Sequence, residues 1–301
     1  MRSRTVSVSP KTKMKISAID IGSNSVRLGT TADGKTLYKR ISTTRLGEGL
    51  SLTGVMKPEA IERSAVQIAE FYREAIEEGA ERVYAFATAA VRSAKNGGDF
   101  VRRVKELCGL EVDVIDGALE AEIGMLGAVG KGDGGMIDIG GASTEVTVRS
   151  GGKTVYSQSV NIGAVRLYDL AGRDKQKVEK TVAEKLEEFK PFCAKLHHMR
   201  GVSGTATTLA ALKHGLKEYD ASVVQDTVLT LEEVENYAGE LLETPVEKIC
   251  EILTVDTRRA DIIGGGAVLL HSLMKRFEIP RITVSDRDNL EGYIILKEGG
   301  L

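Results

Sequence analysis

The sequence predicts an α/β protein made of two related domains. Short apolar runs typical of strands alternate with longer segments whose apolar residues recur at helical spacing. The string at residues 137–143 repeats that at 19–25 at five of seven positions, and in both places two further strands are predicted after it. A glycine-rich linker, residues 130–135, lies directly before the second copy, as expected at a domain boundary.

The first domain is placed at residues 15–131. Before it, residues 1–14 form a basic segment without an apolar core, and we expect a disordered tail there. Pro58 near its start and Gly79 at its end mark the clearest helix. The predicted order is strands 16–21, 26–31 and 35–46, helix 58–78, strand 83–88, helix 100–107, strand 112–115 and helix 119–129.

The second domain is placed at residues 132–301 and begins with the same three-strand pattern. We also consider that the last helix packs back on the first domain. The predicted order is strands 136–139, 144–149 and 154–160, a charged helix 175–196, a short strand at Val202, a helix from Gly204, three further helical stretches, strand 282–285 and helix 290–296. Gly264, Gly265 and Gly266 lie in an apolar run without a P-loop ending, which favours close helix packing.

Composition excludes several classes of protein. The 301 residues are 42% hydrophobic and carry a net charge of -2, so no global field favours nucleic acid or an anionic membrane, and we expect neither as a partner. No apolar run approaches the roughly 18 residues of a membrane span. Three widely spaced cysteines match neither a disulfide framework nor a zinc site, which indicates a reduced, cytoplasmic protein.

Both repeated turns have the chemistry of a phosphate site. An Asp ends a strand, glycine follows so that the backbone can approach an anion closely, and small hydroxyl or amide residues add donors. The alternative is that each is only a hairpin turn. The candidate phosphate-binding residues are Gly22, Ser23, Asn24 and Ser25 in the first turn, and Gly140, Gly141, Ala142, Ser143 and Thr144 in the second. Asp20, Asp138 and Glu145 are the candidate ligands of a hard cation.

Six motifs in order resemble the exopolyphosphatase and guanosine pentaphosphate phosphohydrolase family. They are AIDIGSNSVRL (18–28), TRLGEGL (44–50), ATAAVRSAKN (87–96), IDIGGASTEV (137–146), NIGAVRL (161–167) and GVSGTATTLAAL (201–212). The resemblance implies two ribonuclease H-like domains of the actin, sugar-kinase and heat-shock-chaperone ATPase superfamily, with an interdomain cleft. It also implies that the two turns grip neighbouring phosphoryl groups across that cleft.

The resemblance further implies that Glu120 is the general base. A carboxylate can orient and deprotonate a water in line with the scissile bond. The alternative is a solvated acid at a helix start, and Glu122 is a nearby competitor. The acid that often precedes this glutamate in the family is replaced here by Leu119. Arg45 and Arg92 are implied phosphate ligands, with surface arginines as the alternative.

Two further segments remain open. Gly204 and Thr205 open a helix whose N–H groups can hold an anion, although capping explains that threonine equally well. Near the C-terminus the family has a glycine and an arginine where this chain reads Asp288-Asn289-Leu290, so a helix or a phosphate contact differs there.

We expect metal-assisted attack of water on a terminal phosphoryl group, with Mg²⁺ as the cation. Inorganic polyphosphate is the first substrate and guanosine pentaphosphate the second. A small-molecule phosphotransferase and a non-catalytic phosphate or nucleotide sensor are the rivals of other classes. A homodimer is a further expectation, and the two-domain length predicts distributive digestion of short or intermediate polyphosphates.

Overall fold

The chain forms two compact units in a computed structural model that describes residues 14–23, 25–141, 143–192, 198–253 and 257–299. Unit 1 consists of two stretches of the chain, the residues up to Glu120 and those from Tyr293 onward. Unit 2 is Ala121–Gly292. The division falls inside α5 (Gly117–Ala128) and α13 (Asn289–Lys297), because each is a continuous helix that starts in one unit and ends in the other. The linker expected at residues 130–135 instead leads into β6 (Gly134–Ile139) within unit 2. Residues 1–13 of the predicted tail, 1–14, lie outside the described residues.

Unit 1 is built on a sheet with strand order β3-β2-β1-β4-β5. The first three strands are antiparallel neighbours, and β4 runs parallel to β1 and to β5. Their bounds are β1 (Lys15–Ile21), β2 (Val26–Ala32), β3 (Lys35–Ser42), β4 (Arg82–Ala87) and β5 (Asp113–Val114). The third strand is shorter than the predicted 35–46, because Arg45 has a left-handed φ of 51° that no strand accommodates.

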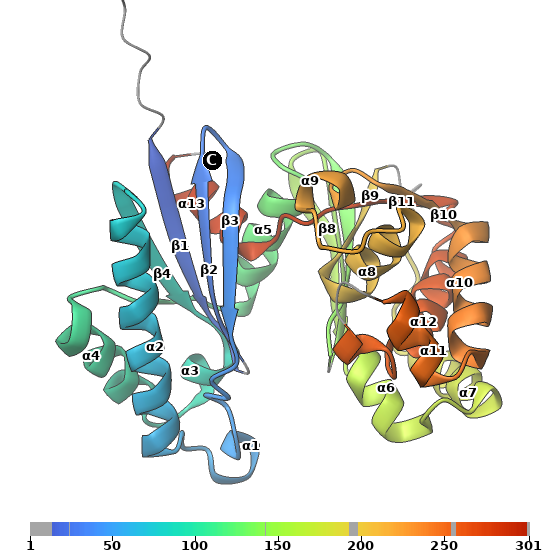
Figure 1. The fold of residues 1–301 in the computed structure, drawn as a ribbon, viewed down its shortest axis with the longest axis horizontal. Coiled ribbons are helices and arrows are strands. Elements are labelled where there is room, and N and C mark those ends of the chain that lie inside the picture. The colour runs from blue at the N-terminus through green and yellow to red at the C-terminus, as the bar shows by residue number, and fades with distance from the viewer. Residues whose placement is uncertain (1–13, 24, 142, 193–197, 254–256, 300–301) are drawn as a thin grey trace, which may run out of the picture. The chain divides into compact units, whose positions relative to one another are not determined.

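Helices cover the sheet of unit 1 (Figure 1). The long helix α2 (Pro58–Glu77) buries one face, including Ala65, Ile68 and Phe71, against the sheet core, and α4 (Gly97–Cys108) packs on α2. Pro58 is the first residue of α2, as predicted. The short helices α1 (Leu50–Thr53) and α3 (Ala89–Ser93) follow β3 and β4.

Unit 2 repeats the same sheet and extends it. Its strand order is β10-β11-β9-β6-β7-β8. The five strands β11, β9, β6, β7 and β8 match β5, β4, β1, β2 and β3 of unit 1 in order and direction. This topology confirms the predicted fold class of duplicated ribonuclease H-like domains. The bounds are β7 (Thr144–Ser150), β8 (Lys153–Val160), β9 (Met199–Val202), β10 (Val228–Thr230) and β11 (Arg281–Val284).

The helices of unit 2 differ from the prediction in number and in length. The charged helix α7 (Lys175–Leu186) ends well before residue 196, because Pro191 lacks an N–H and its ring excludes a helical preceding residue. A helix not predicted, α6 (Ala164–Ala171), follows β8 directly. The remaining elements are α8 (Ser203–Lys213), α9 (Ala221–Val224), α10 (Leu231–Glu243), α11 (Val246–Ile252), the 3-10 turn η1 (Thr257–Arg259) and α12 (Ile263–Arg276).

The three glycines of α12 allow close helix packing, as predicted. A Cβ on Gly264 would lie 2.8 Å from the backbone nitrogen of Leu242 in α10, and one on Gly266 would lie 2.8 Å from the Thr205 hydroxyl in α8. The glycines of α12 therefore let the α10 backbone and the Thr205 side chain of α8 approach this helix closely. None of the helices in the described ranges is long and apolar enough to cross a bilayer.

Candidate functional site

The two repeated turns have the same local structure. The Gly22 N–H donates to the Ser25 carbonyl at 3.0 Å, and the Gly140 N–H donates to the Ser143 carbonyl at the same distance. Ser23 and Gly141, at the corresponding tips, are both exposed. The repeat seen in the sequence is thus also a repeat of this backbone hydrogen bond and of the strand register around it. Two predicted phosphate ligands, Asn24 and Ala142, lie outside the described residues.

Each turn is supported by the segment that follows the third strand of its unit. In unit 1 the Gly47 N–H donates to the Ser23 carbonyl at 2.7 Å. In unit 2 the Ala164 N–H donates to the Gly140 carbonyl at 3.0 Å, and a Cβ on Gly163 would lie only 2.5 Å from that oxygen. The motifs TRLGEGL and NIGAVRL therefore hold the two turns in place.

Arg45 lies beside the first turn, two residues before Gly47. Its side chain is exposed, and its backbone has a φ of 51°, a conformation that costs free energy in a residue other than glycine. The strained backbone brings the following Gly47 onto the turn. An exposed guanidinium at this point can pair with an anion held by the turn.

Asp20, at the end of β1, forms an ion pair with Arg27 of β2. The two residues are directly opposite in the antiparallel ladder, and the carboxylate is buried, with 8% of its side chain exposed. The Arg27 Nε donates to Oδ2 at 3.1 Å, and Nη2 donates to the same oxygen. This predicted metal ligand is thus bound to a cation of the protein itself.

Asp138 and Glu145 occupy the same two positions at the second turn. They are directly opposite in the β6–β7 ladder, so their carboxylates share one face of the sheet. Ser159 of β8 donates to the Glu145 Oε1 at 2.6 Å, which orients that carboxylate. The structure therefore brings two of the three predicted metal ligands together and leaves Asp20 in the other unit.

Thr144 has a structural contact in place of the predicted free hydroxyl. It is fully buried, and its Oγ1 donates to the Ile162 carbonyl at 2.5 Å. The hydroxyl is used inside the fold because Ile162, in the segment that follows β8, lies within hydrogen-bonding distance of it. Ser143, which is partly exposed, retains the position expected of a side-chain donor.

Glu120 lies in the first turn of α5, where Arg92 of α3 contacts it. The Arg92 Nη1 donates to the Glu120 Oε2 at 3.3 Å and to the Ile115 carbonyl at 2.7 Å, so both side chains are held although partly exposed. Asp116 caps the helix by accepting the Leu119 N–H at 2.8 Å. Arg92 is thus a neighbour of the candidate base, and Glu122 is exposed on the next residues of the helix.

Gly204 and Thr205 lie in the first turn of α8, where an unpredicted arginine joins them. The Arg259 guanidinium lies against the Gly204 backbone, so that a Cβ there would be 1.8 Å from its Nη1. Thr205 is buried beside Gly266 and makes no side-chain cap of the helix. A guanidinium at a helix N-terminus combines two features that favour anions.

A tyrosine and an aspartate lie near this arginine. The Tyr219 hydroxyl donates to the Asp286 carboxylate, and burial together with the Asp286 charge raises the pKa of Tyr219 far above its usual range. The hydroxyl consequently stays a protonated donor at all physiological pH values. Asp286 is the residue directly after Ser285, at the C-terminal end of β11.

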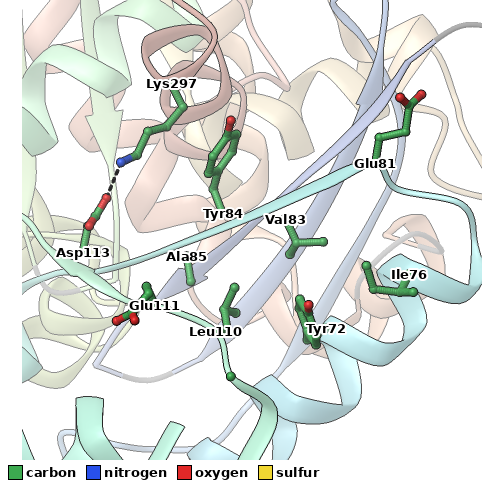
Figure 2. Close-up of a pocket in the computed structure, with 11 residues that line it drawn as sticks. Tyr72, Ile76, Glu81, Val83, Tyr84, Ala85, Leu110, Glu111, Asp113 and Lys297 are labelled. Carbon is green, nitrogen blue, oxygen red and sulfur yellow. Dashed lines mark ion pairs between the residues drawn. The ribbon is translucent and has the colours of Figure 1, made fainter. Parts of the chain in front are cut away.

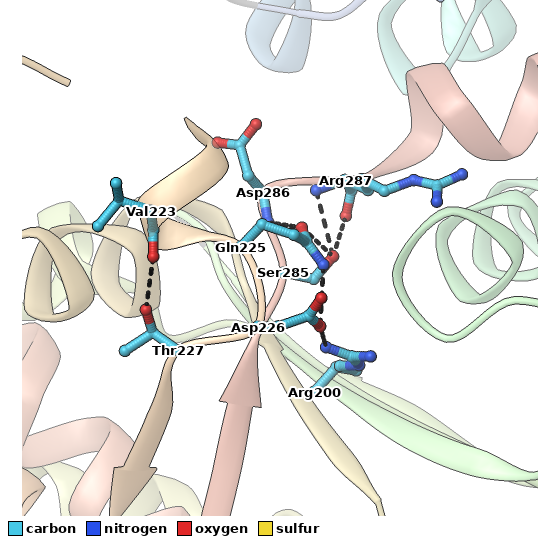
Figure 3. A network of polar contacts seen from close by, with 8 residues as sticks. All are labelled: Arg200, Val223, Gln225, Asp226, Thr227, Ser285, Asp286 and Arg287. Carbon is cyan, nitrogen blue, oxygen red and sulfur yellow. Dashed lines mark hydrogen bonds and ion pairs between the residues drawn. The ribbon is translucent and has the colours of Figure 1, made fainter. Parts of the chain in front are cut away.

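Two segments distant in sequence, around Gln225 and around Ser285, are joined by polar contacts (Figure 3). The Gln225 Oε1 accepts the Asp286 N–H at 2.9 Å, and the Ser285 hydroxyl bonds both the N–H and the carbonyl of Arg287. Asp226 pairs with Arg200 of β9. These contacts fix the chain just before α13.

The altered segment Asp288-Asn289-Leu290 begins α13. The Asp288 carboxylate accepts the Leu290 N–H at 3.0 Å, and Glu291 accepts the Asp288 N–H at 2.9 Å, which is a reciprocal helix cap. Leu290 is buried, with 1% of its surface exposed. The departure from the family pattern thus has a structural explanation in a capped, apolar helix start.

A pocket of unit 1 lies away from these residues (Figure 2). It has a volume of about 320 Å³ and is lined by residues including Tyr72, Tyr84, Glu111 and Lys297, and by none of the predicted site residues. Lys297 pairs with Asp113 at 2.5 Å, and Tyr293 donates to the same carboxylate. Burial alone would raise the pKa of Asp113, but these two partners lower it. The pocket marks where the second half of α13 is anchored.

The family to which this chain belongs follows from a match to a protein-family model. The model of the Ppx/GppA phosphatase family matches residues 29–299. The chain belongs to the Ppx/GppA phosphatase family. This confirms the resemblance drawn from the six motifs, and the family match runs through both units.

Individual family members are similar over nearly the whole chain. Exopolyphosphatase 2 of Mycobacterium tuberculosis is 31% identical over 95% of this chain and 99% of its own length. The crystal structure of the Aquifex aeolicus Ppx/GppA family member superposes with a TM-score of 0.83 at 30% identity, covering 95% of this chain and 98% of that one. A bifunctional 3-dehydroquinate synthase/phosphatase of Fusobacterium nucleatum is 29% identical, and this chain spans 46% of its length.

Two arginines of the site were missed by sequence reasoning. Arg27 lies seven residues after Asp20, as Glu145 does after Asp138, so a residue-by-residue alignment of the two copies could have found it. Arg259 carries no such signal, because the chain brings it to Gly204 from a distant segment. Among the described residues no group of three His, Cys, Asp or Glu side chains forms a metal cluster.

Proposed function

We propose that this family member releases terminal phosphate from a phosphoanhydride by attack of water. The observation that carries the proposal is the pair of turns closed by the same backbone hydrogen bond, together with a glutamate held by an arginine at the start of α5. Phosphoryl transfer requires little covalent chemistry from the protein, so positioning and electrostatic stabilisation provide most of the rate. The site residues supply both.

Glu120 is proposed as the general base. Its carboxylate is partly exposed and can therefore contact water, while the 3.3 Å contact from Arg92 limits its rotation. Proton acceptance by a positioned carboxylate contributes typically about 10²- to 10⁴-fold to the rate. Arg92 has further N–H donors, which can pair with phosphoryl oxygens.

The turns are proposed to bind phosphoryl oxygens through backbone N–H groups. Their exposed tips, Ser23 and Gly141, have room for an anion to approach, and glycine backbones allow close contact. Ser25 and Ser143 add hydroxyl donors at corresponding positions. Arg45 at the first turn and Arg259 at Gly204 add positive charge.

The proposed cation is Mg²⁺, and the donor set at the second turn fits it. Asp138 and Glu145 offer carboxylate oxygens on one face of the sheet, and Mg²⁺ is commonly held by one or two carboxylates plus substrate phosphates. When bound, the ion would neutralise charge on the phosphoryl oxygens. Ser159 would keep the Glu145 carboxylate oriented toward it.

Inorganic polyphosphate is the proposed first substrate, supported by the 31% identity with an exopolyphosphatase over almost the full length of both chains. Guanosine pentaphosphate is the second, because a guanosine-5'-triphosphate,3'-diphosphate pyrophosphatase of Photobacterium profundum is 26% identical over 92% of this chain. That relative is longer, and the chain spans 58% of it. A homodimer and a cytoplasmic location remain predictions.

A phosphate-release panel tests the proposal. Polyphosphates of defined length, guanosine pentaphosphate and ATP are each assayed with and without Mg²⁺. We expect metal-dependent phosphate release, fastest from polyphosphate. Transfer of label from ATP to an acceptor without free phosphate would identify a phosphotransferase, and binding without turnover would identify a sensor.

A further inference from the structure

The sheet of unit 1 has an edge that no strand covers among the described residues. β4 pairs with β1 along its whole length, whereas β5 reaches only the last two residues of β4 on the other side. The Glu81 N–H donates to the Lys15 carbonyl at 2.9 Å, toward β1. Because the backbone groups of successive strand residues point to alternate edges, those of Arg82 and Tyr84 point to the open edge. This part of β4 therefore offers N–H and C=O groups to a further strand.

The related sheet of unit 2 continues at the same edge. There β11, the counterpart of β5, has four residues instead of two, and β10 lies antiparallel beyond it. In unit 1, residues 109–112 do not pair with β4, and the pocket of about 320 Å³ lies between them (Figure 2). Unit 2 thus closes with its own strands an edge that is open in the described part of unit 1.

The pocket at this edge has an apolar wall and two acidic ends. Tyr72 and Leu110 line it together with Ile76, 48% of whose surface is exposed. Glu81 and Glu111 are both exposed and lie at opposite ends of the pocket (Figure 2). Such an edge favours an extended segment that has one apolar face and basic residues at both ends.

We propose that residues 4–9 of this chain, part of its basic N-terminal segment, bind at this edge as a further strand antiparallel to β4. Their sequence, RTVSVS, alternates β-branched and small polar residues, so Val6 and Val8 would share one face and cover the apolar wall. Arginines at positions 2 and 4 precede the two valines, and lysines at positions 11 and 13 follow them. The segment therefore matches the two acidic ends of the pocket in charge.

The length of the connection fits this placement. Lys15 begins β1 beside Glu81, at the end of β4 where the pocket also begins. Pro10 lies between the segment and β1, where a residue without an N–H suits the end of a strand. Residues 10–13 can span up to about 13 Å, and a strand beyond β4 would lie about 10 Å from β1, twice the strand spacing. The segment can thus reach the edge within its own chain and would shield it from pairing with other molecules.

The test is amide hydrogen exchange of the full chain, measured residue by residue by nuclear magnetic resonance. The double variant Val6→Asp/Val8→Asp puts charge on the apolar face of the segment. The amides of Arg82 and Tyr84 should exchange at least about 10-fold faster in this variant than in the wild type. The Val83 amide, which points toward β1, is the internal control and should exchange equally in both.

Ser7→Asp is the matched control variant, because its charge would lie on the other face of the segment and should leave the exchange slow. Equal exchange of the two edge amides in the wild type and the double variant would overturn the proposal. Slow exchange that is lost on about 10-fold dilution would overturn the placement within one chain, because the strand would then come from a second copy.

A second variant keeps the test decisive if circular dichroism shows that the first does not fold. Glu81→Lys with Glu111→Lys reverses the charge at both ends of the pocket and should speed exchange of the same two edge amides. Glu106→Lys on α4, away from the pocket, is its control and should leave them slow. Unchanged exchange in the double charge reversal would also contradict the proposal.

Discussion

The first and second Asp-Ile-Gly turns share their backbone and differ in their charges. Both are closed by the same hydrogen bond and supported by a glycine from the segment after the third strand. At the cross-strand position beside them, one carries Arg27 and the other Glu145. The comparison teaches that a duplicated fold preserves a backbone hydrogen bond and its support, while a single cross-strand residue changes the charge beside the turn.

The largest effect on turnover is expected at Glu120, which lies in α5, outside both Asp-Ile-Gly turns. Glu120→Gln should lower turnover by about 10²- to 10⁴-fold and leave substrate binding nearly unchanged, because the amide oxygen still accepts from Arg92 but cannot take up a proton. Steady-state phosphate release and equilibrium binding measure the two separately.

Glu122→Gln is the matched control for this change, on the same helix and exposed. It should behave as wild type. Turnover of Glu120→Gln within about 5-fold of wild type would remove Glu120 from the mechanism. A parallel loss of binding would give it a structural role.

The second effect is expected at the charge that distinguishes the turns. Glu145→Gln should raise the Mg²⁺ concentration for half-maximal activity by roughly 10- to 100-fold, because it removes one of two anionic ligands. Ser159→Ala, which removes only the 2.6 Å hydrogen bond to Glu145, should have a smaller effect in the same direction. An unchanged Mg²⁺ dependence in Glu145→Gln would place the cation elsewhere.

The third effect compares the two supporting glycines. Gly163→Ala should lower the free energy of unfolding by about 1–3 kcal/mol, because the new Cβ would lie 2.5 Å from the Gly140 carbonyl oxygen. Gly47→Ala should cost less, because its closest atom is the Ser23 Cβ at 3.0 Å. Urea denaturation measures both.

Gly239→Ala in α10 serves as the control, since no atom lies within 4 Å of the added Cβ. It should stabilise the protein by roughly 0.5–1 kcal/mol, because alanine is the better helix residue. An equal loss in the free energy of unfolding for Gly163→Ala and Gly47→Ala would mean that the two supporting segments pack equally closely against their turns.

The smallest effect is expected from the buried hydroxyl that only the second turn has. Thr144→Val should cost about 1 kcal/mol, since it removes the donor to the Ile162 carbonyl while preserving shape. Val26, which is fully buried, holds the corresponding position in the first turn. Activity at saturating Mg²⁺ should stay near wild type in Thr144→Val. A large loss of activity without loss of stability would assign the hydroxyl to the substrate.

The predicted elements were right where local pattern decides them and wrong where tertiary packing does. Alternation and turn residues located the strands of both sheets except β10, and Pro58 located the start of α2. The ends of β3 and α7 were misplaced because Arg45 adopts a left-handed backbone and Pro191 stops a helix that charge patterning continues. The helix α6 was missed: its first residues were used only as the family motif NIGAVRL, and no helix was predicted between residues 160 and 175.

By itself the sequence determined the duplication, the family and the positions of the acids and glycines, because turn chemistry and strand period are encoded in neighbouring residues. Tertiary structure decided which partner each charge obtains. Arg92 reaches Glu120 from α3, and Arg259 reaches Gly204 from η1. Tyr293 anchors α13 in unit 1 on Asp113. Such contacts depend on how distant elements pack, and no local pattern records that.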